Sequence, residues 1–205
     1  MTSARDALEA LRAGNARFVA GTHSHGTLVN ESRRSELLHG QAPHAVIIGC
    51  SDSRVPIEHI FDAGFGELFV IRVAGNIITP EVLGSAEYAA SFLGTRLIVV
   101  LGHSSCGAVS ATFESLKGAE PEIPRNLFSI LHGIAPVLQS MLTSNANATL
   151  KDAVRANTCA SVEQLQTESE ALEQLSQHED LFMMGAEYDL KTGVVELFHN
   201  KPLPE

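Results

Sequence analysis

Two short apolar runs, Ala45–Gly49 and Leu97–Gly102, constrain the fold of this chain more than any other feature. Both are rich in β-branched residues and do not alternate with polar ones, which is typical of strands covered on both faces of a parallel sheet. Each run ends in Gly and is followed directly by a reactive side chain, Cys50 or His103. Because ligands gather outside the carboxyl ends of parallel strands, we expect the two loops to converge on one site.

Strand and helix patterns alternate along the rest of the chain, and 205 residues are enough for one well-buried domain. We therefore predict a single α/β domain over residues 1–205, with a central, mostly parallel sheet flanked by helices. Residues 1–40 form an extended N-terminal helical arm that we expect to pack on a partner subunit. Further strands are predicted at Glu67–Val73, Leu181–Ala186 and, as an antiparallel edge, Val194–Phe198; the main later helices follow Pro80, Pro124 and Leu150, the last with a break near Thr158–Ser161.

The composition excludes several classes of function. With 14 Lys and Arg against 24 Asp and Glu, the net charge of -10 leaves no basic patch for a nucleic acid. We expect no window to be apolar enough to cross a bilayer, and the N-terminus lacks the apolar core of a secretory signal, so we expect a cytoplasmic protein without a membrane partner. Three cysteines are too few for a disulfide scaffold, which favours a metal or catalytic use.

The two strand-end loops together carry a set of zinc-ligand types: Cys50, His103 and Cys106. Ser104 could cap a helix that begins in the second loop, which would place Cys106 and Gly107 in its first turn, where backbone N–H groups favour a thiolate. Three protein ligands leave one coordination position for water, as in catalytic zinc sites, whereas structural sites usually have four. Cys159 has no His or second Cys at ligand spacing, so we interpret it as a small buried apolar residue.

The motifs Cys50-Ser-Asp-Ser-Arg54 and His103-Ser-Ser-Cys-Gly107 closely resemble those of the β-class carbonic anhydrases, and the resemblance extends over roughly residues 4 to 198. It implies a zinc enzyme that converts CO2 reversibly to bicarbonate and a proton, by attack of zinc hydroxide on CO2 in an apolar pocket. It also implies specific roles for the matching residues: Cys50, His103 and Cys106 as zinc ligands, Asp52 and Arg54 as a catalytic dyad, and Gln41, Phe69, Tyr88 and Gly107 as the lining of the CO2 pocket.

The chemistry of the dyad agrees with this resemblance. Two thiolates make a zinc-bound water less acidic than imidazoles would, so an acceptor that orients the nucleophile is needed, and Asp52 is the candidate. Arg54 can pair with Asp52 through two hydrogen bonds and keep it ionised. Asp52 could alternatively become the fourth zinc ligand in a closed state at low pH, and we expect the open state near neutral pH and above.

The sequence alone leaves two alternative functions open. A zinc hydrolase of another small linear substrate, such as carbon disulfide, uses the same family scaffold, and a zinc-stabilised binding module is a second alternative. The resemblance further implies a homodimer or a dimer of dimers, with the pocket completed across the interface.

One departure from the family concerns regulation. Some members bind bicarbonate at a non-catalytic site made by a Trp, an Arg and a Tyr. Arg72 and Tyr188 match two of these positions here, but Ile47 occupies the Trp position and has no indole N–H. We therefore expect bicarbonate to contribute little to closing the zinc site.

Overall fold

A five-stranded sheet forms the centre of the computed structural model, which describes residues 1–23, 30–119, 124–178 and 180–198. The strand order is β2-β1-β3-β4-β5; the first four strands are parallel and β5 pairs with β4 in the antiparallel direction. This arrangement confirms the predicted fold class. The strands are β1 (Ala45–Gly49), β2 (Leu68–Arg72), β3 (Leu97–His103), β4 (Phe182–Tyr188) and β5 (Val195–Phe198).

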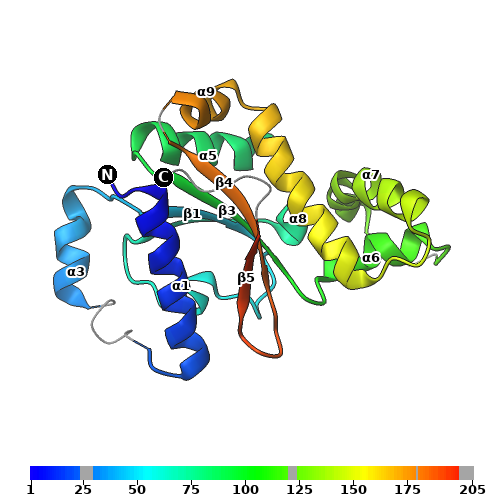
Figure 1. Cartoon of the computed structure of the whole chain (residues 1–205), viewed down its shortest axis with the longest axis horizontal. Helices are drawn as coiled ribbons and strands as arrows, with labels where there is room; N and C mark the ends of the chain where they lie inside the picture. Colours follow the sequence, from blue (N-terminus) through cyan, green and yellow to red (C-terminus); the bar gives the residue numbers. More distant parts are fainter. Residues whose placement is uncertain (24–29, 120–123, 179, 199–205) are drawn as a thin grey trace.

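Helices cover both faces of the sheet (Figure 1), which explains why β1 and β3 are apolar without alternation. One face packs against α1 (Ala4–Ala20) and the short α4 (Ile57–Ile60). The other face packs against α5 (Pro80–Phe92), α8 (Leu150–Thr167) and α9 (Glu170–His178). Thr79 caps α5 and Pro80 occupies its first turn, as the sequence predicts.

A helical hairpin projects beyond the sheet at the right of Figure 1 and encloses a third apolar cluster. It consists of α6 (Gly107–Leu116) and α7 (Phe128–Ser144), the latter preceded by a 3-10 turn at Arg125–Leu127. Ile134 and Leu138 of α7 are buried in this cluster, which also contains Cys50 and Cys106. The two candidate ligands thus lie beside an apolar wall.

The same helix corrects one expectation from the sequence. By length and composition alone, Arg125–Ser144 is apolar enough to cross a membrane, with a mean hydropathy of 1.3, so the expectation that no window would be was wrong. The physical reason is that the segment Arg125–Ser144 has Arg125 as its only charged residue, and its helix α7 supplies the apolar stripe that covers the third cluster.

The predicted break within Leu150–Leu175 lies elsewhere than expected. Helix α8 runs without interruption through Thr158 and Ser161, and the chain breaks only at Glu168 and Ser169, where the Ser169 hydroxyl accepts the N–H of Leu172. The polar residues that suggested a break are buried inside the continuous helix.

The N-terminal arm also differs from expectation. The apolar face of α1, formed by Ala4, Ala7, Leu8 and Leu11, is buried on the chain's own sheet. That face is therefore not free for a partner subunit. The arm continues through α3 (Glu31–Glu36) and a 3-10 turn at Leu37–His39, and residues 24–29 lie outside the described part of the chain. Contact of residues 1–40 with a partner stays a prediction.

Candidate metal centre

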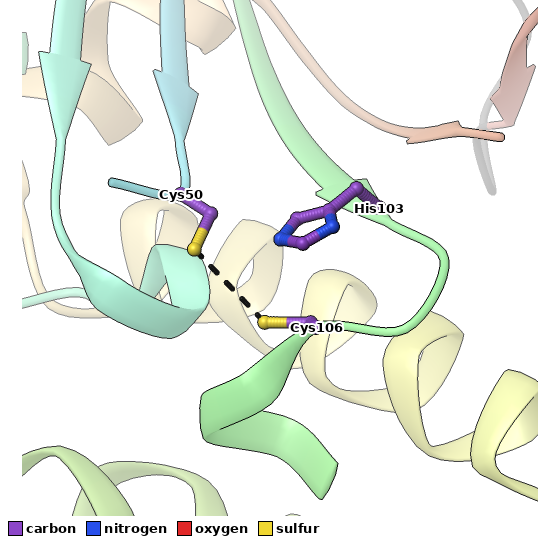
Figure 2. A group of neighbouring side chains, drawn as sticks. All are labelled: Cys50, His103 and Cys106. Carbon is purple, nitrogen blue, oxygen red and sulfur yellow. Dashed lines mark hydrogen bonds between the residues drawn. The ribbon is translucent and has the colours of Figure 1, made fainter. Parts of the chain in front are cut away.

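The strand register brings the two ligand-bearing loops together. Gly49 of β1 pairs with Leu101 of β3, so Cys50, directly after β1, lies beside His103 at the end of β3. Cys106 follows three residues later, at the N-cap of α6. Figure 2 shows the three side chains gathered at this edge of the sheet, and their potential ligand atoms all lie within 4.8 Å of one another. All three residues are buried.

The two cysteines interact directly, with their Sγ atoms 4.0 Å apart. The hydrogen bond from the Cys106 thiol lowers the pKa of Cys50 to about 4, and the Gly75 N–H acts in the same direction. The pKa of Cys106 is raised, because its proton is held by the Cys50 sulfur. A cation would be needed to stabilise both cysteines as thiolates.

His103 has one nitrogen free for a ligand. Its Nδ1 lies 3.0 Å from the Ser104 carbonyl oxygen, and a carbonyl can only accept, so Nδ1 carries the proton. The lone pair is then on Nε2, which is buried and has no hydrogen-bond partner among the described residues. A metal ion would satisfy that atom, and an outer hydrogen bond of this kind fixes the tautomer of many metal-binding histidines.

Asp52 and Arg54 form the predicted pair at the rim of the centre. Arg54 Nε donates to Asp52 Oδ1 at 2.9 Å, and Arg54 Nη2 donates to Asp52 Oδ2 at 2.7 Å. These hydrogen bonds from Arg54 hold the pKa of Asp52 well below its usual range. Arg54 Nη2 also donates to the Ser105 carbonyl, 3.2 Å away, which links the pair to the loop between His103 and Cys106. The arrangement corresponds to the open state described above.

Ser104 has a different role from the predicted helix cap. Its hydroxyl accepts the N–H of Leu190, and its own N–H donates to the Tyr188 carbonyl, so it ties the ligand loop to the β4–β5 hairpin. Cys106 itself occupies the N-cap of α6, and Gly107 is the first helical residue. A Cβ on Gly107 would meet no atom within 4 Å, so the space beside the cluster is open there.

Three residues support the ligand loops, and two of them, Asn157 and Ser161, were missed by the sequence analysis. Arg72 donates to the carbonyl oxygens of Cys50 and Asp52, at 3.0 and 2.7 Å. From α8, Asn157 donates to the Gly75 carbonyl and Ser161 to the Asn76 carbonyl. One sequence signal could have identified these two residues of α8. They are polar residues on the face of an amphipathic helix that packs against the core, where apolar residues are expected.

Three predicted pocket residues lie away from the cluster of their own chain. Phe69 pairs with Val46, near the start of β1, whereas the ligands follow the ends of β1 and β3. Tyr88 is 47% exposed on α5 and lies against Phe69, with ring centroids 6.3 Å apart. Gln41 precedes β1 and lines a surface hollow with Leu37 and Phe65. The chain therefore does not bring these residues to its own Cys50.

The residues discussed for regulation and the third cysteine are not part of the cluster. Ile47 is fully buried in the core on the α1 side, and Tyr188 packs there with Phe18. Arg72 lies on β2, which β1 and β3 separate from the β4 strand that carries Tyr188. Cys159 lies on α8, and burial raises the pKa of its thiol.

Comparisons with known proteins agree on one family. The family model described as carbonic anhydrase matches residues 45–195. A carbonic anhydrase from Mycolicibacterium smegmatis is 43% identical over 193 residues, which cover 93% of this chain and 91% of that protein. Carbonic anhydrase 2 from Mycobacterium tuberculosis is 53% identical over 110 residues, 54% of this chain and 53% of that protein.

Solved structures show the same likeness in three dimensions. The β-carbonic anhydrase CcaA superimposes with a TM-score of 0.73 at 29% identity, covering 97% of this chain and 92% of that one. One of two tetrameric β-carbonic anhydrases from Sordaria macrospora gives a TM-score of 0.71 at 25% identity, covering 92% of this chain and 94% of that one.

Proposed function

Because this chain belongs to the β-class carbonic anhydrases, we propose that it hydrates CO2 reversibly with zinc held by Cys50, His103 and Cys106. The observation that carries the proposal is the buried Cys-His-Cys cluster with the Asp52–Arg54 pair at its rim. Neither part alone specifies the chemistry, because buried cysteines are common in cores and surface ion pairs are common everywhere.

The donor set fits zinc. Thiolate and imidazole ligands favour zinc over hard cations such as Mg²⁺ and Ca²⁺, which prefer oxygen. Two thiolates on tetrahedral zinc, at about 2.3 Å each, are separated by roughly 3.8 Å, close to the 4.0 Å between the Sγ atoms here. The unpartnered Nε2 of His103 supplies the third donor. When bound, zinc would act as a Lewis acid and make a water in its remaining position nucleophilic near neutral pH.

The dyad orients that chemistry. Arg54 keeps Asp52 ionised, so its carboxylate is an acceptor throughout the neutral range. Asp52 can then accept a hydrogen bond from the attacking water. This hydrogen bond would direct a lone pair of the water oxygen toward CO2. Arg54 holds both carboxylate oxygens, which prevents Asp52 from rotating freely. The apolar wall formed by Ile77, Val109 and Ile134 suits an uncharged substrate.

The position of the other pocket residues favours an oligomer. Phe69 lies three residues before Arg72, the β2 residue that pairs with Gly49, so it is roughly 10 Å from the ligand-bearing edge at about 3.3 Å per residue. Phe69, Tyr88 and Gln41 can line a CO2 pocket only if a second copy of the chain brings them to this cluster. We therefore propose a homodimer, or a dimer of dimers, in which each copy completes the pocket of the other.

Metal analysis combined with stopped-flow assays tests this function. We expect bound zinc in each chain, fast hydration of CO2 and loss of that activity after the zinc is removed by a chelator. Carbon disulfide in a parallel assay serves as the competing substrate. Full zinc occupancy without CO2 hydration would indicate a zinc-stabilised binding module, and preferential turnover of carbon disulfide would indicate a hydrolase; either result contradicts the proposal.

A further inference from the structure

We propose that Asn157 and Ser161 of α8 are positioning residues of the metal centre, because they hold the Gly75–Asn76 turn whose N–H binds the Cys50 sulfur. The inference rests on the zinc-binding part of the proposed function. It assigns to a helix far along the chain a role in controlling a ligand that follows the first strand.

The contacts form a continuous chain of hydrogen bonds. Asn157 Nδ2 donates to the Gly75 carbonyl at 2.8 Å, and Ser161 Oγ donates to the Asn76 carbonyl at 3.0 Å. Gly75 N–H in turn lies 3.4 Å from Cys50 Sγ. Asn157 and Ser161 are only 3% and 2% exposed, so the side chains cannot turn to solvent for replacement partners.

The turn requires such support. Gly75 has φ 72° and Asn76 has φ 45°, so two consecutive residues are left-handed, and the second has a side chain. A Cβ on Gly75 would lie 2.9 Å from Ile134 Cδ1, so the site also needs glycine for close packing against α7. The conformation therefore depends on groups outside the turn, and α8 supplies two of them.

The geometry at the sulfur gives these contacts a chemical consequence. A thiolate that accepts an N–H hydrogen bond donates less charge to a bound metal, and outer hydrogen bonds also hold a ligand in its binding orientation. Cys50 is one of two thiolates in the donor set, so the Gly75 N–H moderates the excess negative charge that two sulfurs bring. Rotation of the turn would remove that hydrogen bond without touching any ligand.

The test compares Asn157→Leu with Thr158→Val in the full-length, zinc-loaded protein. Thr158 is the adjacent residue, is also fully buried, and uses its hydroxyl for the Val154 carbonyl within α8. Zinc affinity is measured by chelator competition. The cobalt-substituted proteins then report the sulfur-to-metal charge-transfer band, which a merely structural role of Asn157 would leave unchanged.

We expect Asn157→Leu to weaken zinc binding by about 10-fold to 100-fold, the usual effect of losing an outer partner, and to shift the charge-transfer band. Thr158→Val should match the unmodified protein in both measurements. Ser161→Ala should weaken binding by about fivefold, and it decides the question if Asn157→Leu does not fold. Unchanged affinity and an unchanged band in the folded variants would overturn the inference. Failure of the unmodified protein to bind zinc would instead overturn the proposed function on which it rests.

Discussion

At the scale of single residues, the three cysteines differ in what surrounds them. Cys50 and Cys106 face each other and His103 in a buried cluster, whereas Cys159 lies on α8, outside that cluster. Cys106→Ser should lower zinc affinity by roughly 100-fold or more and remove CO2 hydration, because a hydroxyl is a poor substitute for a soft thiolate. Cys159→Ser is the matched control and should keep both. Metal analysis checks this, and full zinc occupancy in Cys106→Ser would remove Cys106 from the ligand set.

The Asp52–Arg54 pair predicts a pH-dependent contribution to stability. Hydrogen bonds from Arg54 depress the pKa of Asp52, so the pair stabilises the folded protein above the unfolded-state pKa of about 4 and loses this effect as pH falls further. Arg54→Ala should therefore be less stable than the unmodified protein at neutral pH, and the difference should shrink below about pH 4. Urea unfolding of both proteins across this range measures it; a difference that grows toward acid pH would contradict the assigned sign.

The same pair predicts a change in coordination. Arg54 and the metal compete for the Asp52 carboxylate, so Arg54→Ala should move Asp52 onto zinc and depress activity. In the unmodified protein we expect the open arrangement at about pH 8.5 and the closed one to gain at about pH 6. Crystal structures of the zinc-loaded protein at both pH values, with one of Arg54→Ala, provide the measurement. Asp52 bound to zinc at the higher pH would contradict this switch.

Local sequence signals predicted the ligand loops because Cys50 and His103 each follow an apolar run and a glycine directly. The same signals could not identify Asn157 or Ser161 as supports, since their partners are backbone carbonyls far away in the sequence. Every residue has a backbone carbonyl, so the sequence does not show which residue such a side chain will contact.

At the scale of elements, contact between α1 and the segment after α4 depends on one glycine. A Cβ on Gly14 would overlap the Phe61 carbonyl oxygen, so Gly14→Ala must move α1 away from Phe61. We expect a loss of roughly 1–3 kcal/mol in the free energy of unfolding. Denaturant unfolding measures it, and an unchanged midpoint would show that α1 can move without cost.

Gly84→Ala in α5 is the control for that variant. Gly84 is exposed, and a Cβ there would meet no atom within 4 Å. Alanine should therefore raise the stability by about 0.5–1 kcal/mol, because glycine is a poor helix former. The opposite signs of the two variants separate steric contact from helix propensity.

Element types followed from periodicity and caps, but the predicted break near Thr158–Ser161 was wrong, because α8 is continuous there. The sequence around Asn157, Thr158 and Ser161 resembles a helix interruption because polar residues enter the buried face. The helix continues because their hydroxyl and amide groups find acceptors in the Gly75–Asn76 turn and in α8 itself. Only the tertiary structure supplies those acceptors.

At the scale of the whole molecule, the exposed aromatic residues test the proposed dimer. Tyr88 stacks on Phe92, which is 79% exposed, and both residues lie on α5. The Tyr88 ring also contacts Phe69 of β2. Phe92→Glu should dissociate the dimer and reduce CO2 hydration without loss of zinc, because burial of the new carboxylate would be unfavourable. Light scattering and metal analysis measure these effects.

Val194→Glu, at a position 45% exposed on the β4–β5 hairpin, is the control and should stay dimeric. An unmodified protein that is monomeric and still active at micromolar concentration would contradict the shared pocket. The sequence named Gln41, Phe69 and Tyr88 through family resemblance, but it could not indicate that they lie away from their own chain's cluster. That assignment depends on how copies assemble.

The parallel pairing of β1 with β3 has a consequence for how the protein folds. The connection between the paired strands spans about fifty residues, including β2 and α5. The two ends of this long loop must come together before Cys50 can approach His103. Such long-range contacts form slowly, because the chain loses the entropy of a large loop before it gains the contacts. We therefore expect zinc, bound as proposed, to stabilise a sheet whose centre has already assembled rather than to act as an early folding nucleus.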